Sequence, residues 1–127
     1  MLHEKTRRLA AAANFAVLAT RLPDGAVQGH VMWIDCDEDH LYINTEVHRR
    51  KFANLERDPR VTVTIVDRND PYSFVEVRGR VVGTTRGSEA RHHIDTLSMK
   101  YLGKPYSTRI QSERVMLKIA ADREVIH

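Results

Sequence analysis

Val61-Thr62-Val63-Thr64-Ile65-Val66 alternates apolar β-branched residues with threonine, which predicts a β-strand with one buried face. A turn-forming run, Arg68-Asn69-Asp70-Pro71, follows it, and residues 74–84 predict a second, longer strand. Two strands joined by so short a turn pair antiparallel. Gly79, inside the second strand, predicts a β-bulge or a point where another segment of backbone approaches closely.

The rest of the chain extends this antiparallel pattern. Four further apolar segments predict strands, at residues 15–20, 27–34, 40–45 and 115–119. Segments rich in helix formers predict three short helices, at residues 4–14, 46–57 and 88–101. Pro23-Asp24-Gly25 and the acidic residues 35–39 predict turns. The sum is a mainly β (α+β) fold, in which about six antiparallel strands close into a small barrel with short flanking helices.

Composition and charge narrow the class of protein. The 127 residues suffice for one domain spanning residues 1–127, and no Pro- or Gly-rich linker divides them. No apolar run approaches the roughly 20 residues that span a bilayer, and no secretory signal opens the chain, so we expect a cytoplasmic protein. The net charge of +3 comes from interspersed charges of both signs, and most aromatic residues fall at core-like positions, which argues against nucleic-acid binding.

Motifs for side-chain catalysis and metal binding are absent from the sequence. It contains no Gly-x-Ser-x-Gly elbow, no phosphate-binding lysine loop and no Gly-x-Gly-x-x-Gly. No two of its seven histidines stand at an i, i+4 spacing, which favours solvated or hydrogen-bonded histidines over a metal site. The single cysteine, Cys36, excludes an internal disulfide, and its acidic neighbours predict a raised thiol pKa and an unreactive side chain.

A basic run at the start of a predicted helix is the first candidate binding feature. Arg49, Arg50 and Lys51 follow the end of a predicted strand. The free N–H groups and dipole of a helix start favour an anion, and arginine grips a phosphate with two hydrogen bonds. The run predicts either a phosphate-binding corner or a solvated basic face paired with acidic neighbours.

The single tryptophan is the second candidate feature. Trp33 lies on a predicted strand among apolar neighbours, within residues 28–34. A large planar side chain there predicts either a wall for a planar ligand or a residue of the core or of a dimer interface.

Several motifs occur in a characteristic order along nearly the whole chain. They are residues 14–20 (NFAVLAT), 23–25 (PDG), 31–35 (VMWID), 44–45 (NT), 49–55 (RRKFANL), 58–61 (DPRV), 70–72 (DPY) and 75–81 (VEVRGRV). This order resembles the pyridoxamine 5′-phosphate oxidase-like superfamily, and within it the group of F420-dependent flavin/deazaflavin oxidoreductases. The resemblance implies a split β-barrel that forms a homodimer, with a cofactor at the subunit interface between both chains.

The resemblance also implies which residues hold the cofactor. It places the cofactor phosphate against Arg49, Lys51 and Asn54, with Arg50 nearby. It lays the planar ring along the backbone of two segments, Met32, Trp33 and Ile34 on one side and Ile43, Asn44 and Thr45 on the other. Because the tail of F420 is anionic, a wider basic groove is expected, with Arg57, Arg60, Arg78 and Arg80 as further candidates.

The expected activity follows from the same resemblance. It implies hydride transfer from reduced F420 to an unsaturated, hydrophobic acceptor such as an enone, a quinone or a tetrapyrrole. Because such a cofactor carries the redox chemistry itself, no catalytic side chain is assigned. Two alternatives remain open at this stage: an FMN-binding reductase or oxidase of the same fold, and a non-catalytic carrier of F420, haem or flavin.

Overall fold

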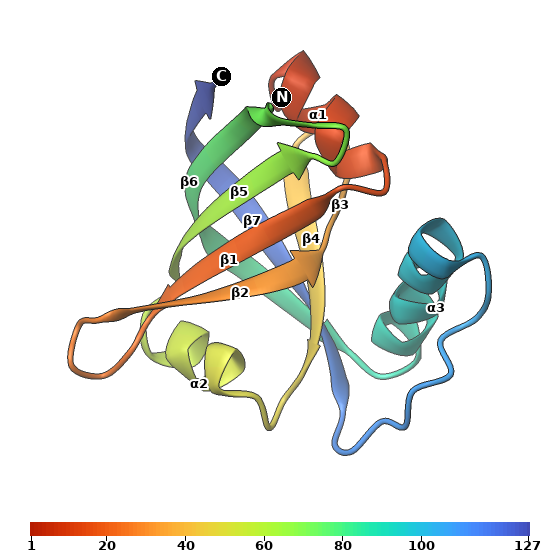
Figure 1. The fold of residues 1–127 in the computed structure, drawn as a ribbon. Helices are drawn as coiled ribbons and strands as arrows, with labels where there is room; N and C mark the ends of the chain where they lie inside the picture. The colour runs from red at the N-terminus through yellow and green to blue at the C-terminus, as the bar shows by residue number, and fades with distance from the viewer.

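Seven strands and three short helices make up the computed structural model, which describes residues 1–127 (Figure 1). The helices are α1 (Glu4–Ala11), α2 (Arg50–Arg57) and α3 (Ser88–Leu102). The strands are β1 (Phe15–Arg21), β2 (Val27–Trp33), β3 (Asp35–Cys36), β4 (His40–Glu46), β5 (Arg60–Asp67), β6 (Asp70–Arg86) and β7 (Arg114–Ile126). No helix of the structure has both the length and the apolar character that a membrane crossing requires.

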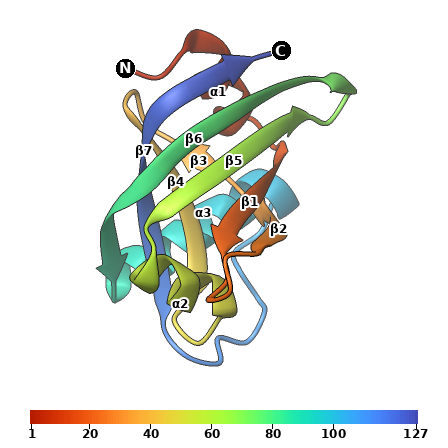
Figure 2. The same ribbon diagram turned by 90° about the vertical axis from the view of Figure 1, so that its left-hand side faces the viewer.

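The strands form one antiparallel sheet in the order β2-β1-β5-β6-β7-β4-β3. The sheet curls around a common interior and is left open between its two edges, which is a split β-barrel (Figure 2). The predicted pair of strands at its centre is confirmed as the hairpin β5–β6. Strand β6 spans 17 residues and pairs with β5 on one side and β7 on the other, so it joins the two halves of the sheet.

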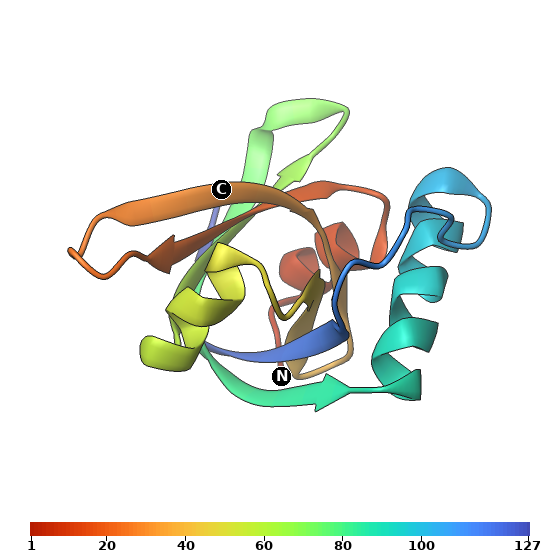
Figure 3. The same ribbon diagram turned by 90° about the horizontal axis from the view of Figure 1, so that it is seen from below.

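The interior is filled by the inward-facing side chains of the alternating strands. Val63 and Ile65 of β5, Val77 of β6, and Leu117 and Ile119 of β7 are completely buried. Helix α1 covers one end of the barrel and α2 lies across the other, whereas α3 stands outside the sheet (Figures 1 and 3). Helix α3 contacts β4, β6 and β7 from outside the barrel.

The start of α2 differs from the prediction. A helix was expected from residue 46, but Glu46 is the last residue of β4 and lies opposite Arg114 of β7. Its buried carboxylate accepts hydrogen bonds from the backbone N–H groups of Gln111 and Ser112, both at 2.7 Å. These contacts with a distant segment keep the residue extended, and the helix begins at Arg50.

Two other boundaries also follow from contacts between distant segments. The predicted turn at residues 35–39 contains the short strand β3, because Asp35 and Cys36 pair with β4. Helix α1 ends at Ala11, before the predicted residue 14, and the Asn14 side chain donates to the Leu9 carbonyl and accepts from the Arg68 N–H. Asn14 thus ties the end of α1 to the β5–β6 turn.

Candidate functional site

The candidate site is a pocket of about 390 Å³ between β2, β4, α3 and the starts of α2 and β7. It is lined by His30, Val31, Met32, Trp33, Asn44, Thr45, Arg49, Lys51, Ile94, Leu97, Tyr106 and Arg114. Three of these residues are cations and six are hydrophobic. Such a lining suits a ligand that has both an anionic group and a planar or apolar part.

Lys51 is the most unusual cation of the pocket. Its residue is only 6% exposed, yet its ammonium group makes no hydrogen bond and no ion pair. Burial lowers the pKa of Lys51 from its ordinary value, and the neighbouring charges of Arg49 and Arg114 lower it further. A partly desolvated charge without a partner is costly, so an anion that enters the pocket relieves this cost.

Arg114 is the second buried cation, and it is held in a defined orientation. Its Nε donates to the side-chain oxygen of Asn44 at 2.8 Å, and its guanidinium lies 3.7 Å from the Glu46 carboxylate. The guanidinium also lies over the ring of Tyr106, 5.3 Å from its centre. Desolvation by burial lowers the pKa of Arg114, although an arginine stays charged at any physiological pH.

His30 adds a neutral polar group beside these cations. Burial lowers the pKa of His30, and the charges of Lys51 and Arg49 lower it further. Its Nδ1 atom is buried and has no hydrogen-bond partner. A buried nitrogen without a partner is rare in proteins and costs free energy.

Aromatic side chains form the apolar wall. Trp33 stacks on Tyr101, with ring centres 5.1 Å apart and planes 5° from parallel, and Tyr106 meets its edge at 6.4 Å. The Ile34 N–H donates to the Tyr101 hydroxyl at 3.1 Å, and this hydroxyl donates to the Asn14 carbonyl. These contacts hold the indole of Trp33 in place. One of them comes from Tyr106, which belongs to the segment between α3 and β7.

The sequence-predicted residues fall into two groups. Met32, Trp33, Asn44, Thr45, Arg49 and Lys51 line the pocket, whereas Ile34, Ile43, Arg50 and Asn54 do not. Ile34 and Ile43 are buried in the core, and Arg50 is exposed. Asn54 is fully buried, and its amide donates to Thr20 at 3.0 Å and to Gln28 at 3.2 Å.

The wider basic groove is not assembled at this pocket. Arg60 pairs with Asp58, Arg78 with Glu76, and Arg80 with Asp122. Arg60 and Arg78 line a separate cavity of about 290 Å³. Arg57 donates to the Arg21 carbonyl. The cations that do meet in the site are Arg49, Lys51 and Arg114, of which sequence reasoning missed Arg114.

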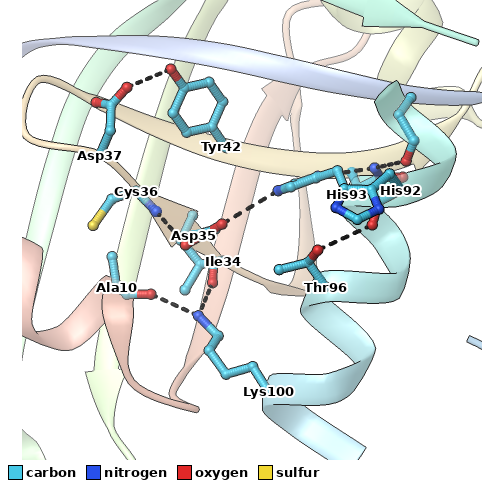
Figure 4. A network of polar contacts seen from close by, with 12 residues as sticks. Ala10, Ile34, Asp35, Cys36, Asp37, Tyr42, His92, His93, Thr96 and Lys100 are labelled. Carbon is cyan, nitrogen blue, oxygen red and sulfur yellow. Dashed lines mark hydrogen bonds and ion pairs between the residues drawn. The ribbon is translucent and has the colours of Figure 1, made fainter. Parts of the chain in front are cut away.

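A polar network behind the site holds α3 against β3 (Figure 4). Lys100 of α3 donates to the carbonyls of Ala10, at 2.9 Å, and Ile34, at 2.5 Å. Asp35 lies 3.6 Å from His93 of the same helix. Burial and the Asp35 charge raise the pKa of the Cys36 thiol, as the acidic neighbours of Cys36 predicted. A thiol with a raised pKa is a poor nucleophile, so Cys36 is not a candidate nucleophile.

Comparison with known proteins places this architecture in a family. The family model described as pyridoxamine 5′-phosphate oxidase matches residues 2–125. The chain belongs to the pyridoxamine 5′-phosphate oxidase family. The resemblance seen in the sequence is thereby confirmed. No curated protein matches the chain.

Solved structures of other members of the pyridoxamine 5′-phosphate oxidase fold are similar along the whole chain. A protein titled "F420 Reductase" has 25% identity and a TM-score of 0.85, with 98% of each chain covered. A conserved hypothetical protein from Mycobacterium tuberculosis has 25% identity and a TM-score of 0.77, with 98% of this chain and 82% of that chain covered. A putative pyridoxamine 5′-phosphate oxidase from Listeria innocua has 19% identity and a TM-score of 0.74, with 97% of this chain and 95% of that chain covered. At this identity the similarity supports the fold alone.

The pocket of this pyridoxamine 5′-phosphate oxidase family member fits a flavin-type cofactor, to which the family and the F420 reductase point. The unpaired ammonium of Lys51, with Arg49 in the same pocket, offers a position for a phosphate. Trp33 and the side chains of Ile94 and Leu97 offer an apolar wall for a planar ring. Both halves of such a cofactor therefore find matching groups in one pocket.

Proposed function

We propose that this protein is an oxidoreductase that uses reduced F420 to transfer a hydride to an unsaturated, hydrophobic acceptor such as an enone, a quinone or a tetrapyrrole. The observation that carries the proposal is Lys51, which is only 6% exposed and whose ammonium, without a hydrogen-bond or ion-pair partner, lies in a pocket with an apolar wall. The similarity to a protein titled as an F420 reductase, over 98% of both chains, supports the choice of cofactor.

The residues of the pocket divide the work of binding. Lys51 and Arg49 neutralise the phosphate, and Arg114 adds a third cation whose direction is set by Asn44. Met32 and Trp33 on one side and Asn44 and Thr45 on the other flank the ring of the cofactor, which would supply the hydride when bound. Trp33 and Tyr106 exclude water from that side.

The two remaining predicted residues act less directly. Asn54 joins α2 to β1 and β2 through Thr20 and Gln28, and so positions the helix that carries Lys51. Arg50 is exposed at the start of the same helix. There it attracts the anionic tail of the cofactor from a longer distance.

Titration with F420 and with FMN, side by side, tests the proposed cofactor. We expect F420 to bind more tightly than FMN, and to lose affinity between about 50 mM and about 500 mM salt because exposed charges such as Arg49 are screened. Reduced F420 should then be oxidised by a quinone in the presence of the protein. A preference for FMN would identify the protein as a flavin enzyme. Binding of F420 without turnover would identify it as a carrier. If neither cofactor binds, the basic residues form a solvated face.

We further propose that two copies of the chain form a homodimer through β1 and β2. Phe15, Val17, Val27 and Val31 of these strands are between 38% and 68% exposed, and Val17 lies opposite Val31 in the register. Val31 also lines the pocket. Neighbouring exposed apolar side chains on one sheet face are typical of an interface, and covering Val31 closes one side of the pocket.

Val31→Glu is expected to raise the dissociation constant of the dimer by at least about tenfold, because a carboxylate would be buried without a partner. Sedimentation velocity over a range of concentrations measures this shift, and the affinity for the cofactor should fall with it. Tyr72→Glu is the control, since Tyr72 is 88% exposed near the start of β6. A wild-type protein that stays monomeric at all concentrations would refute the dimer.

A further inference from the structure

We propose that His93 is a positioning residue, which holds Arg114 in its orientation towards the pocket through the side-chain amide of Asn44. The proposal rests on the proposed function, because the orientation of Arg114 matters when an anionic cofactor is bound. It adds a residue of α3 that does not take part in the basic run or in the aromatic wall.

A continuous chain of buried contacts connects His93 to the pocket. The Nδ1 of His93 lies 3.0 Å from the side-chain nitrogen of Asn44, and the side-chain oxygen of Asn44 accepts from Arg114 Nε at 2.8 Å. The same Asn44 nitrogen donates to the Ala90 carbonyl at 2.9 Å. Asn44 is 4% exposed, and His93 and Arg114 are each 9% exposed. Water is therefore a poor substitute partner for these groups.

The orientation of the Asn44 amide follows from its two outer partners. Arg114 Nε can only donate, so the oxygen of the amide faces it. The Ala90 carbonyl can only accept, so the nitrogen of the amide faces it. The second N–H of that nitrogen points to His93 Nδ1, which must offer a lone pair. Neutral His93 therefore carries its proton on Nε2, on the side of Asp35.

This arrangement makes the amide dependent on an acceptor at position 93. If the acceptor is lost, one N–H of Asn44 is buried without a partner. If His93 is doubly protonated, its Nδ1–H faces an N–H of the Asn44 amide. Turning the amide over would not help, because its oxygen would then face the Ala90 carbonyl and its nitrogen would face Arg114 Nε. Either change releases Arg114 from the direction that it has in the pocket.

Two substitutions of His93 test the role of its acceptor. The Oδ1 of an asparagine is bonded to Cγ, as histidine Nδ1 is, so His93→Asn keeps an acceptor at this place, whereas His93→Leu removes it. At about pH 8 we expect F420 to bind about tenfold more weakly to the leucine variant and within about threefold of wild type to the asparagine variant. His92→Leu is the control, because His92 is the exposed neighbour on α3.

Rescue by the conservative variant separates positioning from a merely structural role, because only the acceptor at position 93 differs in kind between the two variants. Equal affinities of His93→Leu and His93→Asn would overturn the proposal.

A spectroscopic measurement on the free protein needs no cofactor. Long-range ¹H–¹⁵N spectra of the histidine rings should show His93 with its proton on Nε2, and the Arg114 Nε–H signal should be protected from exchange in wild type and His93→Asn but not in His93→Leu. A proton on Nδ1 would refute the inference even if F420 binds. The expected signals together with no binding of F420 would instead refute the proposed cofactor.

Discussion

Lys51→Met is expected to weaken the binding of the cofactor by about 10- to 100-fold and, at the same time, to stabilise the free protein by about 1 kcal/mol. The first effect follows from the loss of a charge-assisted contact with the phosphate. The second follows because Lys51 is 6% exposed and its ammonium has no partner, so methionine fills the space without a buried charge. Calorimetric titration and urea unfolding of the same samples measure the two effects.

The stability gain should depend on pH in a defined direction. The pKa of Lys51 is lowered in the folded protein from the ordinary 10.5, because burial and the charges of Arg49 and Arg114 disfavour the charged form. The penalty is therefore fully present below the lowered pKa and is lost as the pH rises from that pKa towards 10.5. The advantage of Lys51→Met over wild type should shrink over the same interval.

Arg50→Met is the matched control, because Arg50 precedes Lys51 on α2 but is exposed and does not line the pocket. It should change the affinity by at most about threefold, as an exposed charge acts at longer range and is screened. An unchanged affinity of well-folded Lys51→Met would exclude Lys51 from the phosphate site. A loss of stability in that variant would mean that its ammonium has a partner within the protein.

Most of the fold could be predicted because its main signals are local. The alternation of residues 61–66 and the turn after them predicted β5, β6 and their antiparallel pairing, which the structure confirms. The boundaries that were wrong depend on distant partners. Glu46 stays extended because Gln111 and Ser112 bind its carboxylate, 65 and 66 residues further along the chain. No periodicity within a short window contains that information.

The candidate site was predictable to a smaller extent, for the same reason. Arg49 and Lys51 stand in a visible basic run, and Trp33 is the only tryptophan of the chain. Arg114 is a single arginine that reaches the pocket because β7 pairs with β4, and its partner Asn44 is 70 residues away. Tyr106 and His30 carry no motif, and only the closure of the sheet brings them to the pocket.

Gly79→Ala is expected to destabilise the protein by about 4 kcal/mol or more, an unusually large effect for the addition of one methyl group. A Cβ at this position would lie 1.9 Å from the carbonyl oxygen of Ala120 and 3.0 Å from its carbonyl carbon. Both atoms belong to the backbone of β7 and cannot rotate away. The register of β6 and β7 shifts between Arg78 and Gly79, which confirms the predicted bulge and close approach.

Gly83→Ala is the matched control for this effect, since it makes the same chemical change four residues further along β6. A Cβ at Gly83 meets only side-chain atoms of Lys118, at 3.9 Å, and the backbone φ of Gly83 is not positive. We expect this variant to be as stable as wild type or more stable by about 0.5 kcal/mol, because alanine lowers the entropy of the unfolded chain. Equal urea midpoints for Gly79→Ala and Gly83→Ala would mean that β6 and β7 can separate freely at Gly79. A large loss confined to Gly79→Ala would show that the close contact with Ala120 holds together β6 and β7, the strands that connect the two halves of the sheet.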